Sequence, residues 1–197
     1  MKVIGVVGGM GSGKSTVVKL ISESVKAHVI NADYIGHLIL KKGHIGYTHI
    51  VENFGTEILG QDGEIDRGIL GSIVFSDKIK LKALNEISHP LIYDHVKKEI
   101  NNILQQGIYR YIIIDAALLI EIGLIPLVDQ VWGVYAPMDI RVQRVILRNG
   151  FSKEEAIRRI SSQLPWEEIK KITHIQIDNS KGVGYTKEQV LSALKLG

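Results

Sequence analysis

The stretch GVVGGMGSGKSTVVKL, residues 5–20, places a glycine-rich turn directly after a short apolar run. Within it, Gly8, Gly13, Lys14 and Ser15 follow the pattern G-x-x-x-x-G-K-[ST]. Glycines let successive backbone N–H groups point at one anion, and the N-terminus of a following helix adds partial positive charge. The pattern therefore predicts a phosphate-binding loop (P-loop) between a buried strand and a helix. The alternative is a glycine-rich turn that only connects these two elements.

Two residues of this loop indicate which molecule carries the phosphate. Lys14 is placed to reach β- and γ-phosphates, and the Ser15 hydroxyl is placed to bind Mg2+. Together they favour a nucleoside triphosphate with Mg2+ over an isolated phosphate.

Short apolar runs alternate with helical patterns along the chain, which is typical of parallel strands joined by crossover helices. Helices are expected over residues 14–25 and 187–196. The expected strands are Val3–Val7, His28–Ile30, Tyr111–Ile114, Gln130–Tyr135 and His174–Ile177. The sequence therefore predicts an α/β fold with a doubly wound, parallel, five-stranded sheet.

Two long stretches interrupt this alternation, and both are predicted to be parts of a single domain spanning residues 1–197. Residues 36–106 contain no apolar strand pattern and are far longer than a crossover requires, which predicts a largely helical insert. Residues 139–173 are rich in Arg and Lys and carry two helical patterns separated by NGFS, with Ser152 and Glu155 as an expected capping box. We interpret this second stretch as a mobile lid.

Composition excludes several classes of protein. The net charge of +3 reflects only 24 Lys and Arg against 21 Asp and Glu, too small an excess to indicate a nucleic-acid partner. No run approaches the roughly 18 apolar residues of a membrane helix. The absence of cysteine fits a reducing compartment, so a cytoplasmic location is expected. The oligomeric state is not determined by the sequence.

A P-loop identifies a nucleotide and not a reaction. The tetrapeptide N-K-x-D, which GTPases use for guanine, does not occur in the chain. The remaining pattern favours a small kinase that moves a γ-phosphoryl group to a small acceptor under a closing lid. Asp33 follows the second strand, at the sheet edge where ligands bind. Its carboxylate would accept the acceptor's proton or cap the next helix, and position alone does not decide between them.

Seven segments, in order, carry a resemblance to a known family. They are GGMGSGKST, Asp33 in NADYIGH, FGTEILGQDGEIDRGIL at residues 54–70, His89 with Pro90, ALLIE ending at Glu121, the pair Arg144 and Arg148, and IDN with Asp178 and Asn179. Their order and spacing resemble the dephospho-CoA kinase family, which phosphorylates the ribose 3'-hydroxyl of dephospho-CoA with ATP in the last step of CoA biosynthesis. The resemblance implies a P-loop NTPase fold like that of nucleoside monophosphate kinases. The alternatives are a P-loop kinase for another small hydroxyl acceptor and a non-catalytic nucleotide-binding regulator.

The resemblance also implies roles for individual residues. The ATP phosphates and Mg2+ would be bound by the loop residues Gly8, Gly11, Ser12, Gly13, Lys14, Ser15 and Thr16. Asp33 would be the catalytic base, and the helical insert would bind the CoA part of dephospho-CoA. Arg67 and His89 would lie at this acceptor site. The alternatives are a surface ion pair for Arg67 and a helix cap or core position for His89.

Further positions concern the lid and the nucleotide. Arg144 and Arg148 are four residues apart and share a helical face, so both would point at the phosphates when the lid closes. The alternative is a solvated basic face. Asn179 heads a loop that resembles the adenine-contacting loop of the family. Asp115 ends an apolar strand and is a candidate for Mg2+ binding through water.

Four positions depart from the family pattern. Asn31 stands where a first aspartate is frequent, which leaves Asp33 as the only carboxylate of its tripeptide. Ala117 replaces the usual proline of PLL, Arg141 occupies a position that is commonly glutamine, and the stretch from Asn179 to Gly182 is one residue longer than N-x-G. These departures affect the fine geometry of adenine binding and leave the predicted reaction unchanged.

Overall fold

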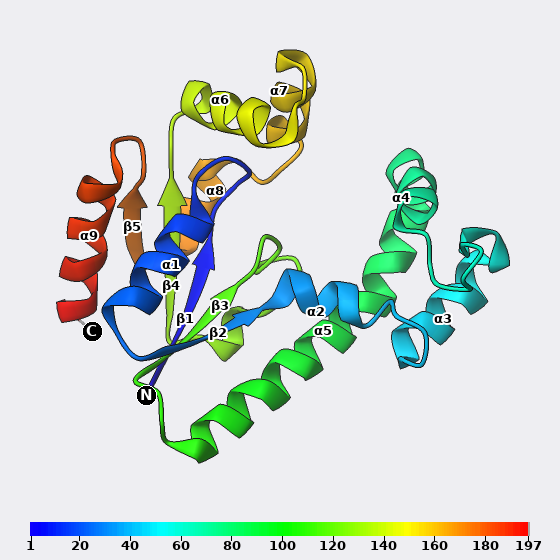
Figure 1. Ribbon diagram of the computed structural model, residues 1–197, viewed down its shortest axis with the longest axis horizontal. Helices are drawn as coiled ribbons and strands as arrows, with labels where there is room; N and C mark the ends of the chain where they lie inside the picture. Colours follow the sequence, from blue (N-terminus) through cyan, green and yellow to red (C-terminus); the bar gives the residue numbers. More distant parts are fainter. Residues whose placement is uncertain (197) are drawn as a thin grey trace.

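The computed structural model describes residues 1–196 and is built on one five-stranded sheet (Figure 1). The strands are β1 (Lys2–Val7), β2 (Ala27–Asn31), β3 (Tyr111–Asp115), β4 (Gln130–Tyr135) and β5 (Ile175–Asp178). Their spatial order is β2-β3-β1-β4-β5, and every pair is parallel. The predicted doubly wound sheet with its five strands is therefore confirmed.

Both faces of the sheet are covered, which explains why its strands are apolar runs without alternation. In β3, Ile112 and Ile114 belong to the core on one face, while Tyr111 and Ile113 belong to the core on the other. All five residues of β3 are buried. The sheet therefore forms the middle layer between two hydrophobic cores.

Helices α1 (Lys14–Ser24) and α9 (Val183–Leu196) pack against each other on one face of the sheet. The expected apolar stripe of α1 is buried there, with Val17 and Ile21 fully inaccessible to solvent. The predicted start of the last helix at residue 187 was wrong, since α9 begins at Val183.

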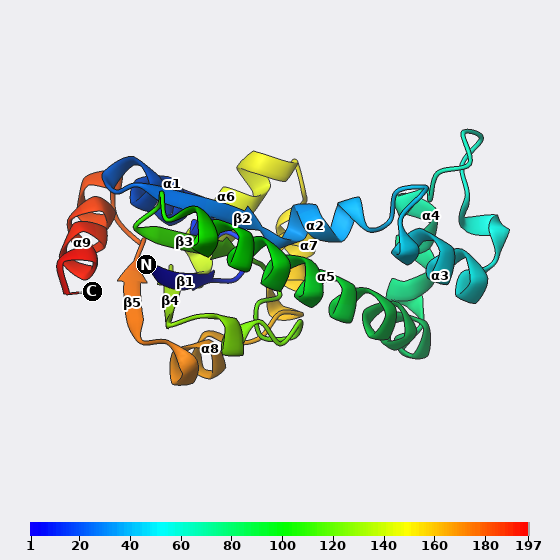
Figure 2. The same cartoon turned by 90° about the horizontal axis from the view of Figure 1, so that it is seen from below.

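The stretch 36–106 is largely helical in the structure, and part of it packs on the sheet. It holds the end of α2 (Ala32–Leu38), then α3 (Ile45–Phe54), a short 3-10 helix (Thr56–Ile58), α4 (Arg67–Ser76) and α5 (Lys78–Gln106). In Figures 1 and 2, α3 and α4 lie at the far end of α5, away from the sheet. The C-terminal half of α5 packs on the sheet through Ile92, Val96 and Ile100. Ile39, just after α2, belongs to the same core, so only α3, α4 and the start of α5 stand apart from it.

Helices α3, α4 and the start of α5 have a small hydrophobic core of their own. Its buried members are Ile50, Phe54, Ile58, Ile65, Leu70 and Val74. Asp66 and Asp77 begin α4 and α5 as N-caps, because the side chain of each accepts two backbone N–H groups. This unit is joined to the sheet by the continuous helix α5.

The stretch 139–173 contains three helices where the sequence predicted two. They are α6 (Met138–Asn149), α7 (Lys153–Ser161) and α8 (Trp166–Ile172). In Figure 1, α6 and α7 lie beyond the ends of the strand arrows, while α8 lies beside β4. Val142, Val145, Ala156 and Ile160 form the small core between α6 and α7.

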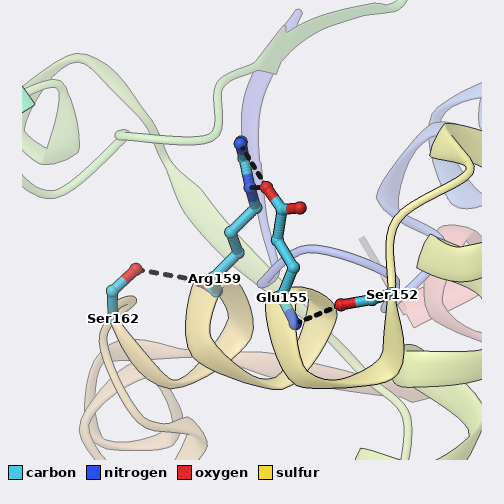
Figure 3. Close-up of polar contacts among 4 residues, drawn as sticks. All are labelled: Ser152, Glu155, Arg159 and Ser162. Carbon is cyan, nitrogen blue, oxygen red and sulfur yellow. Dashed lines mark hydrogen bonds and ion pairs between the residues drawn. The ribbon is translucent and has the colours of Figure 1, made fainter. Parts of the chain in front are cut away.

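The expected capping box at α7 is half formed (Figure 3). The Ser152 hydroxyl accepts the backbone N–H of Glu155 at 3.1 Å, as predicted. The Glu155 carboxylate does not return to the cap, because it binds the guanidinium of Arg159 at 2.9 Å. Within residues 1–196, no helix has both the length and the apolar character needed to span a membrane.

The separate core of α3 and α4 predicts a localised response to a cavity. Ile50→Ala should destabilise the protein by about 2–5 kcal/mol, because Ile50 is fully buried and the cavity cannot close completely. Hydrogen exchange should accelerate first in α3 and α4, and urea unfolding measures the total loss. Ile45→Ala on the same helix is the control, since Ile45 is 56% exposed. Equal losses for both variants would contradict the assigned core.

Candidate functional site

The glycine-rich loop connects β1 to α1 at the carboxyl edge of the sheet. Gly11 and Gly13 have φ angles of 80° and 91°, a region that side chains rarely adopt. Gly13 is the N-cap of α1 and offers no side chain to its first amides. The loop therefore has the backbone conformation and the uncapped helix start that an anion requires.

A cavity of about 510 Å3 lies over this loop. Its walls bring together residues that are far apart in the sequence. The predicted site residues among them are Gly8, Gly11, Gly13, Lys14, Ser15, Thr16, Asp33, Arg144 and Arg148. The structure thus gathers the predicted phosphate, base and lid residues at one place.

Ser12 is the predicted loop residue that does not line this cavity. It is 2% exposed, and its hydroxyl has no hydrogen-bond partner among the residues that the structure describes. A Cβ added to Gly8 would collide with this hydroxyl. The Ser12 side chain therefore lies behind the loop, and the backbone N–H of Ser12 donates to the Gly9 carbonyl at 3.0 Å.

Lys14 forms an ion pair with Asp115 at the end of β3. Both side chains are about nine-tenths buried, and Asp115 lies opposite Val6 in the register of β3 with β1. This pair shows that the strand end and the loop lysine face each other directly.

Asp33 lies in the first turn of α2. Of its two predicted roles, the structure excludes that of helix cap. Asn31 is the N-cap, since its side-chain oxygen accepts the N–H of Tyr34 at 2.7 Å. Asp33 is exposed to the cavity, and its Oδ1 accepts the N–H of Ala117 at 3.2 Å. A proline at position 117 would lack this N–H. The departure at Ala117 therefore gives Asp33 a backbone donor.

Arg144 of α6 donates hydrogen bonds to the loop. Its guanidinium donates to the carbonyls of Gly11 and Ser12, both at 3.3 Å, and to the carbonyl of Asn179 at 2.8 Å. Arg148 is exposed and donates to the side chain of Asn149. The two arginines share the cavity, but in this structure Arg144 is engaged with backbone carbonyls.

Asn179, which was predicted to head an adenine-contacting loop, has a buried side chain with 4% exposure. Its amide donates to the Ser12 carbonyl at 2.8 Å, and its side-chain oxygen accepts the Thr186 hydroxyl at 2.8 Å. Both polar ends of this side chain are therefore used inside the protein, and any adenine contact at this position is left to the backbone.

Sequence reasoning missed two residues that bind the loop. Gln163 accepts the N–H of Met10 at 2.7 Å, and Arg141 donates to the Met10 carbonyl at 2.9 Å. Burial lowers the pKa of the Arg141 guanidinium, and the nearby Tyr135 opposes this effect. Arg141 was noticeable only as a departure from the family pattern, and no local signal pointed to Gln163.

Arg67 and His89, predicted for the acceptor, do not line the P-loop cavity. Arg67 is exposed at the start of α4, close to His37 of α2. Partial desolvation lowers the pKa of His37, the charge of Arg67 lowers it further, and Asp33 opposes both. Arg67 and Asp33 therefore both lie near enough to His37 to act on its imidazole.

His89 is half-buried inside α5, which excludes the alternative that it caps a helix. It lines a separate open cavity of about 470 Å3 together with Lys78 and Lys82. Burial lowers the pKa of His89, while the backbone and carboxylate of Glu121 act in the opposite direction. Glu121 in turn lines a cavity of about 410 Å3 that shares Gly8, Gly9, Ala117 and Gln163 with the cavity over the P-loop.

Comparison with known proteins connects this arrangement to one enzyme family. A family model described as dephospho-CoA kinase matches residues 2–184. A dephospho-CoA kinase of Carboxydothermus hydrogenoformans is 42% identical over 195 residues, which cover 99% of this chain and 94% of the relative. One of Bacillus anthracis is 40% identical over 193 residues, covering 98% of this chain and 96% of the relative.

Solved structures agree with this relationship. The dephospho-CoA kinase from Campylobacter jejuni has a TM-score of 0.72 and 27% identity, covering 98% of this chain and 95% of its own. A protein from Thermus thermophilus reaches a TM-score of 0.83 with 29% identity, covering 99% and 96%. A shikimate kinase from Acinetobacter baumannii, at 15% identity and a TM-score of 0.53, shares the fold alone, with 100% and 92% covered. The chain belongs to the dephospho-CoA kinase family.

Proposed function

We propose that the cavity over the P-loop is the place where this kinase transfers the γ-phosphoryl group of ATP to the ribose 3'-hydroxyl of dephospho-CoA. The observation that supports this most directly is the shared lining of that cavity by Lys14, Asp33 and Arg144. Phosphoryl transfer depends mainly on positioning and on compensation of charge, and these three side chains supply both. We propose the cytoplasm as the place of the reaction, in line with a chain without cysteine.

Lys14 would exchange one anionic partner for another during binding. In the structure its ammonium is paired with Asp115. Triphosphate oxygens carry more negative charge than one carboxylate, and they would lie among the loop N–H groups and the N-terminus of α1. The ammonium would therefore move to the β- and γ-phosphates, and Asp115 would lose its partner.

The residues around Lys14 fit a bound Mg2+. Mg2+ is typically bound by one or two protein oxygens together with phosphate oxygens, and it neutralises charge on the triphosphate. Ser15 is exposed and lines the cavity. Asp115 is paired with Lys14, the residue that precedes Ser15 in the sequence. We propose Ser15 as a direct ligand and Asp115 as a partner of the water molecules bound to the ion.

Asp33 would act as the general base. Its Oδ1 accepts the N–H of Ala117, which fixes the carboxylate relative to the end of β3 and leaves the other oxygen for the acceptor. An oxygen held in this way accepts the proton of the 3'-hydroxyl as that hydroxyl attacks the γ-phosphorus. The proton moves to the carboxylate, and ADP leaves with the electrons of the broken P–O bond.

The acceptor would reach Asp33 from the side of α2 and α4. Arg67 lies there, near enough to His37 to lower its pKa, and offers a cation to the anionic dephospho-CoA. His89 lies farther along α5, beside Lys78 and Lys82. We propose that Arg67 contacts the acceptor near the reacting ribose and that His89 belongs to a more distant part of the acceptor site.

Lys14→Ala should lower kcat/KM by about 100- to 1,000-fold, because the phosphates lose the lysine that carries the charge of the loop. Circular dichroism checks that the fold survives the loss of the Lys14–Asp115 pair. Release of ADP in the presence of dephospho-CoA is the measurement. Lys19→Ala on the exposed side of α1 is the matched control. Unchanged turnover in Lys14→Ala would contradict the assignment of the loop.

Asp33→Asn preserves the shape of the side chain and removes its proton acceptor. We expect kcat to fall by about 100- to 10,000-fold, the usual contribution of a general base. The affinity for ATP, measured by calorimetric titration, should stay within a few-fold of the parent. Asp94→Asn, an exposed substitution on α5, serves as the control. A collapse of ATP affinity would instead place Asp33 on the metal, and Asp115 would become the candidate base.

Arg144→Lys keeps the charge but loses the planar fork, which reaches three carbonyls in the structure. We expect kcat to fall much more than KM for dephospho-CoA rises, because the charge on the transferred group is compensated less well. Arg158→Lys, exposed on α7, is the control. A change confined to KM for the acceptor would show a binding contact and exclude the role in the transition state.

A further inference from the structure

Met10, the residue between the glycines of the loop, is held by two side chains from outside the P-loop motif. The N–H of Met10 donates to Gln163 Oε1 at 2.7 Å. The carbonyl of Met10 accepts Arg141 Nε at 2.9 Å. A terminal nitrogen of Arg141 also lies 3.5 Å from Gln163 Oε1. Both backbone polar groups of one loop residue are therefore fixed by two side chains that contact each other.

These two side chains come from the segment that the sequence predicted to be a lid. Arg141 lies in the first half of α6, and Gln163 lies between α7 and α8. A Cβ added to Gly9 would collide with the guanidinium of Arg141 and press on Gln163 Oε1. Gly9 is thus required for this approach, and the contact is closely packed.

The contact bears on how the loop meets phosphate. An anion-binding loop works when its N–H groups already point at the anion, because ordering them during binding costs affinity. Fixing both polar groups of Met10 fixes the direction of the neighbouring peptide groups at Gly9 and Gly11. The same contact joins the loop to α6 and α7, so the position of the lid and the shape of the loop depend on each other.

We propose that Gln163 and Arg141 are positioning residues for the kinase reaction: together they form a Met10 clamp that shapes the P-loop for the triphosphate and links it to the lid helices. This inference rests on the proposed role of residues 8–16 as the phosphate site. The clamp acts through the loop backbone, and neither side chain has to touch the nucleotide.

The test compares ligands that carry phosphate with ligands that do not. Gln163→Leu and Arg141→Met each remove one side of the clamp and retain most of the side-chain volume. Each should weaken the binding of inorganic triphosphate and of ATP about tenfold, by equal factors for the two ligands, as measured by calorimetric titration. KM for dephospho-CoA and the thermal midpoint should stay close to those of the parent.

Two further variants sharpen this result. Gln105→Leu, the same change at an exposed position in the last turn of α5, should leave triphosphate binding unchanged. The product of the two single effects would be a loss of about hundredfold in affinity. The double variant Gln163→Leu with Arg141→Met should weaken binding by much less than this, because both side chains act on Met10.

Several outcomes overturn the proposal. A loss of ATP binding without a loss of triphosphate binding would mean that Gln163 contacts the nucleoside. A rise only in KM for dephospho-CoA would mean that it contacts the acceptor, and a lower thermal midpoint with unchanged affinities would mean a purely structural role. Lys14→Ala distinguishes failure of the clamp proposal from failure of the proposed phosphate site. If neither Lys14→Ala nor Gln163→Leu changed the binding of triphosphate, residues 8–16 would not be the phosphate-binding loop.

Discussion

The central position of β1 is the constraint on which the rest of the structure depends. It pairs with β3 on one side and β4 on the other, so its carboxyl end is surrounded by the ends of both neighbours. The P-loop begins where β1 ends, and Asp115 ends β3 beside it. The apolar cores on both faces of the sheet keep this arrangement rigid. A glycine-rich loop that would be flexible in isolation is therefore surrounded by strand ends whose positions are fixed.

The surroundings of the P-loop follow from the geometry of its backbone, in which the carbonyls of Met10, Gly11 and Ser12 accept hydrogen bonds from outside the loop. Such a loop directs its carbonyls outward, and these buried acceptors require donors. Arg141 supplies a donor to Met10, Arg144 supplies donors to Gly11 and Ser12, and the amide of Asn179 adds another at Ser12. Charged donors on the outer side also favour an anion on the inner side. Helix α6 therefore supplies hydrogen-bond donors to the P-loop.

The two halves of the proposed substrate site differ in how they are supported. The P-loop lies on the main sheet, whereas α3 and α4 have a small core of their own at the end of α5. Because α5 continues from this core to the sheet, a displacement of α3 and α4 is carried along one helix. Asp33 lies between the halves, on α2, which contacts both α5 and β3.

Local patterns in the sequence determined the five strands, the P-loop, α1 and the Ser152 cap, because each depends on residues close together in the chain. They also led to the family, through motifs in a fixed order. Only the tertiary structure decided that Asn31 and not Asp33 caps α2, that the Asn179 side chain is buried, and that His89 lies outside the P-loop cavity. The pairing of Lys14 with Asp115 spans 101 residues, and that of Met10 with Gln163 spans 153. Contacts at such separations arise from the packing of the whole sheet and its helices, and no local pattern in the sequence encodes them.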